Sequence, residues 1–507
     1  MRAVSRLARS RSSRSHTRAT PSARRARGRL AFCVAGESVL NWCMEPARTI
    51  SRTDDRTPPT AAGQPHLFLT LRCDRPVEPG ARFCLDDADV VTIGRADSLS
   101  IERREEDRVT VLRIGIPDPR MSSAHARLQS VLGSWVVEDA GSKNGTWLNG
   151  KQVKSATLAD GAVLELGHSF LLYRQALPAS NPELLDAREL RPAAPGLATL
   201  SPVLGAQLER LVLMARSGVP ILIRGETGTG KEVIASAIHH VSGRPGPFLA
   251  VNCGALPATL VESELFGYRK GAFSGATEDR PGLVRSSEKG TLLLDEIGDL
   301  PLPAQAALLR VLQEGEVLAV GATHPVKVDL RVIASTHRDL DALVDEERFR
   351  SDLLARLSGF TLSLPPLRER REDFGLLIAA LLRKLAGEAA DGVTFSPEAA
   401  RALLLHTWPL NVRELEKCLS GAIVLSREGR IELEHLPSSL QSREPQAGTT
   451  PPPSKQDKER SRHENLVALL RQHGGNVTAV ARAMGKGRTQ VQRWLRRLGI
   501  DPLSFRC

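Results

Sequence analysis

Residues 221–232, which read ILIRGETGTGKE, decide the central fold of this 507-residue chain. An apolar run typical of a buried strand leads into a glycine-rich turn, and residues 233–240 predict a helix after it. This order is the P-loop arrangement, in which backbone N–H groups, the positive helix end and a lysine surround phosphate oxygens. The predicted nucleotide-binding residues are Gly225, Glu226, Thr227, Gly228, Thr229, Gly230, Lys231 and Glu232.

Further apolar strands bring a second group of polar residues to this loop. Residues 290–298 (GTLLLDEIG) form a strand that ends at Asp295 and Glu296, the Walker B arrangement. Asp295, the predicted metal site, is expected to hold magnesium, and Glu296 to orient or deprotonate the attacking water. A strand over 328–336 ends at Thr336, and residues 247–256 contain another. Strands alternating with helices predict a parallel α/β sheet with ATP and Mg²⁺ at its C-terminal edge.

The composition is that of a multidomain globular protein. Hydrophobic residues make up 41% of the chain and charged residues 25%. The apolar runs fall short of the ~18 residues of a membrane span, and the seven cysteines form no CxxC pair. We therefore expect a cytoplasmic protein without a membrane partner, a disulfide framework or a zinc site.

The net charge of +11 is concentrated at the two ends of the chain. Residues 1–43 carry +9 and residues 455–507 carry +8, which leaves −6 for the residues between them. A basic C-terminal domain favours contact with nucleic acid at that end. Residues 1–65 predict a disordered basic segment. A transit peptide and a translation start at Met44 are the alternatives that the sequence leaves open.

Residues 66–174 are expected to form a β-sandwich, because short alternating strands are separated by hairpin signals such as Asn-Gly at 149–150. Three landmarks accompany these strands: Gly-Arg at 94–95, SSAH at 122–125 and NGT at 144–146. Their spacing resembles that of the forkhead-associated (FHA) domain. Members of that family bind phosphothreonine peptides through the loops at one end of the sandwich.

The FHA resemblance implies a phosphopeptide site and a partner protein that carries phosphothreonine. Phosphate oxygens accept hydrogen bonds from arginine guanidinium groups and from hydroxyl groups, and the matched positions supply both. Arg95 and Ser122 would hold the phosphate, and Ser123 and Lys143 would be auxiliary contacts. Asn144 would bond the peptide backbone.

The stretch ESELFGYRKGAFSGA, at 262–276, distinguishes the P-loop domain from other ATPases. Together with GETGTGKE it resembles the AAA+ domain of sigma-54-dependent transcription activators. Members of this family hydrolyse ATP as ring oligomers, usually hexamers, and remodel RNA polymerase bound to sigma-54. In this family the P-loop motif ends in Gly-Lys-Glu, which explains why Glu232 stands where P-loops normally carry Ser or Thr. Its remodelling loop corresponds here to Gly271, Ala272, Phe273, Ser274, Gly275 and Ala276, with Phe273 at the tip and serine in place of the family's threonine.

Other positions follow from the same resemblance. Asn252 matches the residue proposed to hold the Walker B glutamate between states, and Thr336 matches sensor I, followed by His337 where an Asn often stands. FRSDLLARL at 349–357 makes Arg350 and Arg356 candidate arginine fingers for a neighbour's ATP. WPLNVREL at 408–415 makes Arg413 the sensor II residue.

The C-terminal residues 462–507 predict three short helices, the last two separated by a Gly-Lys-Gly turn. Two helices around a tight turn, the second rich in Arg and Gln, describe a helix-turn-helix. The segment also resembles the Fis-type DNA-binding domain that ends these activators. The candidate DNA contacts are Arg488, Thr489, Gln490, Gln492, Arg493 and Arg496.

The sequence thus predicts a β-sandwich (FHA), an α/β AAA+ P-loop ATPase with a helical lid, and a small all-α helix-turn-helix. The expected boundaries are linker 175–198, ATPase core 199–366, lid 367–436 and linker 437–461. The family resemblance implies a sigma-54-dependent activator, dimeric at rest and ring-shaped when active, that acts on sigma-54 RNA polymerase from upstream DNA sites. Two alternatives stay open: a DNA-binding regulator independent of sigma-54, and a phosphopeptide-binding scaffold whose nucleotide sets its oligomeric state.

Overall fold

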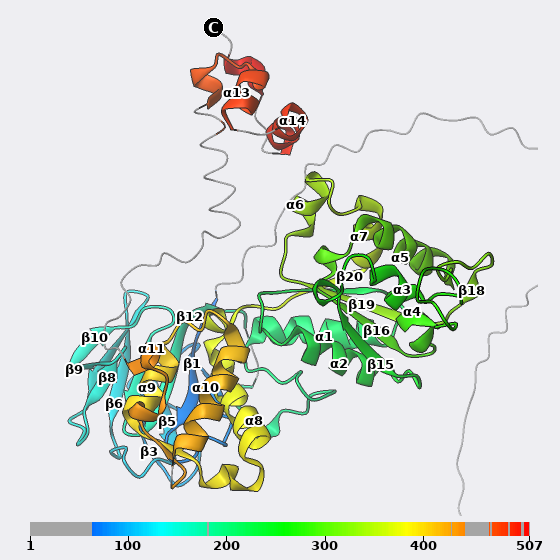
Figure 1. Cartoon of the computed structure of the whole chain (residues 1–507). Coiled ribbons are helices and arrows are strands. Elements are labelled where there is room, and N and C mark those ends of the chain that lie inside the picture. The colour runs from blue at the N-terminus through cyan, green and yellow to red at the C-terminus, as the bar shows by residue number, and fades with distance from the viewer. Residues whose placement is uncertain are drawn as a thin grey trace, which may run out of the picture. The chain divides into compact units, whose positions relative to one another are not determined.

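The computed structural model describes residues 63–179, 182–426, 428–441, 466, 469–484, 487–497 and 501–505, and Figure 1 labels its elements. Almost all of the predicted basic segment 1–65, including Met44, lies outside these residues, as does most of the predicted linker 437–461. Within the described ranges, no helix has the length and apolar character needed to span a bilayer.

The N-terminal described part is the predicted β-sandwich. One sheet has seven strands in the order β13-β2-β1-β12-β11-β8-β9, and the other has six in the order β10-β7-β6-β3-β5-β4. The first sheet comprises β1 (Gln64–Arg72), β2 (Ala81–Cys84), β8 (Thr146–Leu148), β9 (Lys151–Val153), β11 (Val163–Leu166), β12 (Ser169–Leu177) and β13 (Leu184–Asp186). The second comprises β3 (Val90–Arg95), β4 (Ser100–Glu106), β5 (Val109–Ile116), β6 (Ala126–Val131), β7 (Ser134–Asp139) and β10 (Ser155–Thr157).

Local sequence explains two features of this sandwich. Asn149 and Gly150 both have positive φ, 48° and 78°, and form the predicted two-residue hairpin turn between β8 and β9. Strand β13 and the short helix η1 (Ala187–Glu189) lie within the segment predicted as a linker, 175–198. Part of that segment therefore extends the sheet beside β2.

The central part is a three-layer α/β/α domain, as expected. Its parallel strands are β14 (Ile221–Arg224), β15 (Phe248–Asn252), β16 (Thr291–Asp295), β19 (Arg331–Thr336) and β20 (Phe360–Ser363), in the order β15-β16-β19-β14-β20. Leu292 and Leu294 of β16 join one apolar cluster and Leu293 joins another, because successive side chains of a strand point to opposite faces. The helices are α1 (Pro202–Ala215), α2 (Lys231–Ser242), α3 (Val261–Phe266), α4 (Gly282–Ser286), α5 (Leu302–Glu314), α6 (Leu340–Asp345) and α7 (Ser351–Leu357).

A helical lid follows the α/β domain. It contains η4 (Leu367–Glu369), η5 (Arg371–Asp373), α8 (Phe374–Ala386), α9 (Pro397–Leu405), α10 (Asn411–Leu425) and α11 (Ser438–Gln441). A two-stranded parallel pair forms between β21 (Thr394–Phe395), which precedes α9, and β22 (Arg430–Ile431), which follows α10. Trp408 is buried in the lid, and its indole nitrogen donates to the carbonyl of Leu403.

The C-terminal part contains helices α13 (Val477–Ala483) and α14 (Arg488–Arg497), which lie on either side of the predicted Gly-Lys-Gly turn. Asn476 caps α13 by accepting from the backbone nitrogens of Thr478 and Ala479. Val480, Ala481, Val491 and Leu495 are buried together with Leu466 and Leu470.

Candidate functional site

The P-loop between β14 and α2 forms an open cradle. Gly228 and Gly230 have φ of 78° and 98°, a region that favours glycine. Lys231 begins α2 and is only 7% exposed, and its Nζ donates to the carbonyls of Gly225 and Glu226 at 3.1 and 3.4 Å. A Cβ added at Gly230 would meet nothing within 4 Å. A helix N-terminus, a buried ammonium and free space together fit the phosphates of a nucleotide.

The Walker B pair lies against this cradle. Glu296, with φ of 53°, places one carboxylate oxygen 3.5 Å from Nζ of Lys231 and the other 2.6 Å from Nδ1 of His337. Burial alone would raise the pKa of Glu296, but Lys231 and His337 outweigh it and hold that pKa below its ordinary value. Asp295 accepts a hydrogen bond from the hydroxyl of Ser335 at 2.6 Å. Two carboxylates beside a phosphate cradle suit Mg²⁺ and an activated water.

Two other predicted positions, Asn252 and the sensor I residue Thr336, lie at the same edge of the sheet. Asn252 pairs with Asp295 in the parallel register of β15 and β16, and its side chain accepts from the backbone nitrogen of Gly254. Thr336 is fully buried at the end of β19, and its hydroxyl accepts from the backbone nitrogen of Arg338. The roles assigned to Asn252 and Thr336 stay predictions.

The lid contributes contacts to the P-loop that sequence reasoning missed. Arg368 forms a two-pronged ion pair with Glu226 at 2.6 and 2.8 Å, which holds the pKa of that carboxyl below its ordinary value. Arg370 donates to the carbonyl of Thr229 at 2.7 Å, and Asn411 donates to Glu226. In the sequence, these contacts between the lid and the P-loop had one signal. It was an arginine-rich run that follows the last strand of the ATPase core and matches no known motif.

The sensor II residue lies at the rim of the loop. The backbone nitrogen of Val412 donates to the carbonyl of Gly228 at 3.0 Å, and a Cβ at Gly228 would lie 3.0 Å from Cβ of Arg413. The Arg413 side chain is exposed at the start of α10, beside the cradle. Leu410, beside the sensor II residue, has its carbonyl against Gly228 and is 55% exposed.

The two candidate arginine fingers lie on the surface. Arg350 caps α7 and forms an ion pair with Asp352 at 2.7 Å, and Arg356 donates to the carbonyl of Leu312 in α5. Both side chains are exposed. Their described partners belong to α5 and α7 and not to the P-loop of the same subunit. Their role on a neighbour's ATP stays a prediction.

The GAFSGA loop (residues 271–276) projects between α3 and α4. Backbone bonds from Gly271 to the carbonyl of Ala276 and from Ala276 to that of Phe273 close it into a tight turn. Phe273 is 41% exposed and meets Tyr268 edge to face at 5.0 Å. An aromatic ring that is half presented to solvent on a small-residue loop matches the predicted tip.

The predicted phosphopeptide residues converge at one end of the sandwich. The backbone nitrogen of Arg95, at the end of β3, donates to the carbonyl of Ser122 at 2.9 Å. The hydroxyl of Ser122 accepts from the backbone nitrogen of Lys143 at 3.1 Å, and the amide of Asn144 donates to the carbonyl of Arg120 at 2.6 Å. The side chains of Arg95, Lys143 and Ser123 are exposed.

His125 braces these loops. It is fully buried, lies 3.2 Å from the carbonyl of Gly145, and accepts from the backbone nitrogen of Ser122. Burial lowers its pKa, so the imidazole is neutral and can accept and donate in this way. The arrangement fixes the loop that carries Ser122 against the one that carries Lys143.

On the predicted DNA-reading helix α14, the side chains of Arg488 and Gln492 are exposed. The backbone of this helix is described over Arg488–Arg497, but the side chains of Thr489, Gln490, Arg493 and Arg496 lie outside the described residues. Their predicted contacts with DNA stay predictions.

Three family models match the chain. The sigma-54 interaction domain matches residues 197–363, the AAA+ ATPase lid domain residues 368–452, and the FHA domain residues 91–167. Each match falls on the part of the fold that carries the corresponding motifs.

Transcriptional regulators resemble the chain over its ATPase part. GlrR of Escherichia coli is 41% identical over 312 residues, which are 61% of this chain and 69% of GlrR. AtoC of Escherichia coli is 45% identical over 297 residues, 57% of this chain and 64% of AtoC. The acetoin catabolism regulatory protein of Cupriavidus necator is 43% identical over 346 residues, 65% of this chain and 52% of that protein. The chain spans between half and seven tenths of these relatives, and it belongs to the sigma-54-dependent transcription activators, with their AAA+ ATPase domain and lid joined to an FHA domain.

Proposed function

We propose that this protein hydrolyses ATP as a ring oligomer, usually a hexamer, to remodel sigma-54 RNA polymerase at promoters. In this proposal its FHA domain binds a phosphothreonine protein and its C-terminal helices hold it at upstream DNA, with a dimer as the resting form. The observation that carries the proposal is the presence, in one domain, of a phosphate cradle, a Walker B pair and the GAFSGA loop.

The chain's own residues divide the chemistry between them. Lys231 and the N-terminus of α2 would bind the phosphates, and Asp295 would hold Mg²⁺, which neutralises charge on the phosphates when bound. Glu296, ionised and held by His337, would orient the attacking water and accept its proton. Arg413 would sense the nucleotide from the lid. Phe273 would transmit the resulting motion to the polymerase.

Replacing Phe273 with alanine is expected to abolish ATP-dependent promoter opening while ATP hydrolysis stays close to wild type. The ring is 41% exposed and lies outside the nucleotide cradle, so its removal alters the contact with the partner and not the chemistry. The measurement is open-complex formation by purified sigma-54 polymerase, with hydrolysis recorded in parallel. Leu213→Ala, another exposed apolar residue of the same domain, serves as the control.

The alternatives predict other results in this assay. A regulator independent of sigma-54 would hydrolyse ATP and bind DNA without opening the promoter, with or without Phe273. A scaffold that uses nucleotide only to set its oligomeric state would keep its output when Glu296 is changed. Promoter opening that survives Phe273→Ala would contradict the role proposed for the loop.

Replacing Arg95 with alanine is expected to weaken binding of a phosphothreonine peptide about 10- to 100-fold, because a hydrogen bond to a charged group is worth about 1.5–3 kcal/mol. Arg95 is exposed and fixed beside Ser122 at the end of the sandwich. Fluorescence anisotropy with phosphorylated and unphosphorylated forms of a labelled peptide library measures the effect. Arg104→Ala, which removes an equally exposed charge from β4, should leave binding unchanged. Equal affinity for both peptide forms would refute the phosphate site.

A further inference from the structure

The seven-stranded FHA sheet is apolar on both of its faces. Along β12, Leu171 and Tyr173 belong to the core between the two sheets, whereas Phe170 and Leu172 belong to a second cluster on the opposite face. On β11, Leu164 and Val163 divide in the same way. The six-stranded sheet differs, because β4 and β6 leave much of their surface exposed. A sandwich ordinarily has polar outer faces, so the second apolar face needs a partner.

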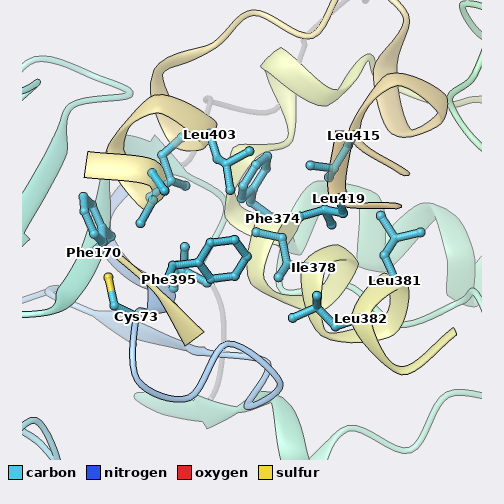
Figure 2. Packing of buried hydrophobic residues seen from close by; sticks show 14 of the residues in the cluster. Cys73, Phe170, Phe374, Ile378, Leu381, Leu382, Phe395, Leu403, Leu415 and Leu419 are labelled. Carbon is cyan, nitrogen blue, oxygen red and sulfur yellow. The ribbon is translucent and has the colours of Figure 1, made fainter. Parts of the chain in front are cut away.

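That partner is the lid of the ATPase in the same chain. Figure 2 shows Phe170 and Cys73 of the FHA sheet packed with Phe374, Phe395 and Leu403 of the lid. These residues are all less than 4% exposed. The backbone nitrogen of Phe395 also donates to the carbonyl of Cys73 at 2.9 Å. The two domains therefore share one hydrophobic core.

Polar contacts surround this shared core. Arg401 of α9 pairs with both oxygens of Glu165 on β11, each at 2.8 Å, and its guanidinium lies 4.8 Å from the ring centroid of Trp147. Glu165 is 5% exposed, so the pair is largely removed from water. Arg174 of β12 reaches Glu372 of the lid at 3.3 Å. Each contact pairs opposite charges across the boundary between the two domains.

A close backbone approach fixes the distance between the domains. Gly375, the second residue of α8, lies so near β1 that an added Cβ would be 2.2 Å from the carbonyl oxygen of Thr70 and 3.2 Å from that of Pro79. Its φ is that of an ordinary helix residue, so glycine is needed here for space and not for backbone conformation. Packing that leaves no room for a methyl group is typical of a specific interface.

The lid segment 368–375, which includes Glu372 and Gly375, also contacts the P-loop. Arg368 and Arg370 bind Glu226 and Thr229, as described above, and Glu372 follows after one residue and binds Arg174 of the FHA sheet. Asp373, wholly buried, accepts from the backbone nitrogen of Leu200 and from the hydroxyl of Thr199, next to α1. Residues 368–375, which run from η4 through η5 into α8, thus touch both the FHA sheet and the nucleotide cradle.

We infer that the FHA domain is an integral part of the AAA+ lid, docked through the outer face of its seven-stranded sheet, and that residues 368–375 couple the FHA domain to nucleotide binding in the same subunit. The phosphopeptide as the physiological input rests on the function proposed above; the docking does not. Spatial continuity alone does not demonstrate coupling, so thermodynamic measurements on the full chain decide the question.

The first test compares two glycines in lid helices. An alanine in a helix ordinarily stabilises relative to glycine, and Gly421 of α10 has nothing within 4 Å of an added Cβ. Gly421→Ala should therefore raise the unfolding temperature by about 2–4 °C. Gly375→Ala should lower it and should change the dissociation constant for a fluorescent ADP at least about fivefold. If Gly375→Ala instead raises the unfolding temperature as Gly421→Ala does, and leaves ADP affinity unchanged, the docking is refuted.

The second test exchanges the charges of the buried pair. Glu165→Arg and Arg401→Glu each place like charges together, and each should speed amide exchange in β11 and α9 by about 100-fold or more. The double exchange restores opposite charges and should recover much of that protection, although not the contact with Trp147. No recovery, together with wild-type ADP affinity in all three variants, would overturn the inference. Recovery would also show that the single variants had not simply misfolded.

The third test adds a phosphothreonine peptide selected for binding to the full chain. Its occupancy should change ADP affinity at least about fivefold in the wild type and much less in Gly375→Ala. A peptide that binds without altering ADP affinity would refute the coupling and leave the proposed FHA function standing. Absence of any phosphate-dependent binding would refute the proposed FHA function, whereas the glycine and charge-exchange results would still decide the docking.

Discussion

Replacing Glu296 with glutamine is expected to lower the rate of ATP hydrolysis by about 10²–10⁴-fold, the usual contribution of a positioned general base. The amide keeps the size of the side chain and can still contact His337, so the cradle should keep its shape. ATP binding should stay the same or become tighter. In the described structure, Nζ of Lys231 lies 3.5 Å from the Glu296 carboxylate. Removing that negative charge removes a competitor of the ATP phosphates for the Lys231 ammonium.

Phosphate release under single-turnover conditions measures the chemical step, and a fluorescent ATP analogue measures binding. Glu209→Gln, which neutralises an exposed carboxylate on α1, should alter neither quantity. A Glu296→Gln protein that still hydrolyses ATP at near the wild-type rate would show that another group activates the water.

The nucleotide site could be predicted from sequence because its chemistry depends on local backbone geometry. A glycine-rich turn between a strand and a helix forms a cradle wherever it occurs, and an apolar strand that ends in Asp295 and Glu296 delivers both carboxylates to one sheet edge. The same holds for the loop residues Arg95 and Ser122, which the order of strands β3 and β6 brings together.

Contacts between distant parts of the chain could not be predicted in this way. Arg368 and Glu226 are 142 residues apart, and no periodicity or motif relates them. The contact of His337 with Glu296 had a weak signal, since His337 directly follows a strand whose end was already placed at the site. Strand β20 was missed because it is short and its residues do not form an unbroken apolar run.

The docking face of the FHA sheet had a signal in the sequence of strand β1. Leu67, Leu69 and Leu71 alternate in sequence, which predicts that all three share one face. In the structure Leu67 and Leu69 lie between the sheets, but Leu71 lies on the lid side, because the register of β1 shifts between Leu69 and Leu71. Phe68, which stands between Leu67 and Leu69, already indicated a strand buried on both faces.

Removing the arginine finger is expected to lower ATP hydrolysis by about 10³–10⁵-fold, the largest effect predicted for any substitution outside the nucleotide cradle. Arg350→Ala and Arg356→Ala are the two variants to compare. Arg356 is held by the carbonyl of Leu312, whereas Arg350 has the exposed carboxylate of Asp352 as its partner. An exposed ion pair of that kind contributes little free energy, so Arg350 is the side chain that is freer to reach another subunit.

Mixing experiments can establish whether the finger acts in a neighbour. Lys231→Ala subunits lack the phosphate-binding ammonium but keep both arginines, and Arg350→Ala subunits keep the cradle but lack one arginine. Each protein alone should be inactive. In mixed rings, a cradle from one variant meets an arginine from the other at about a quarter of the interfaces, so hydrolysis should return to about that fraction of the wild-type rate. An arginine that served its own subunit's ATP would give no recovery at any mixing ratio. Recovery would mean that each catalytic site is completed only when subunits assemble, which makes oligomerisation itself the switch for hydrolysis.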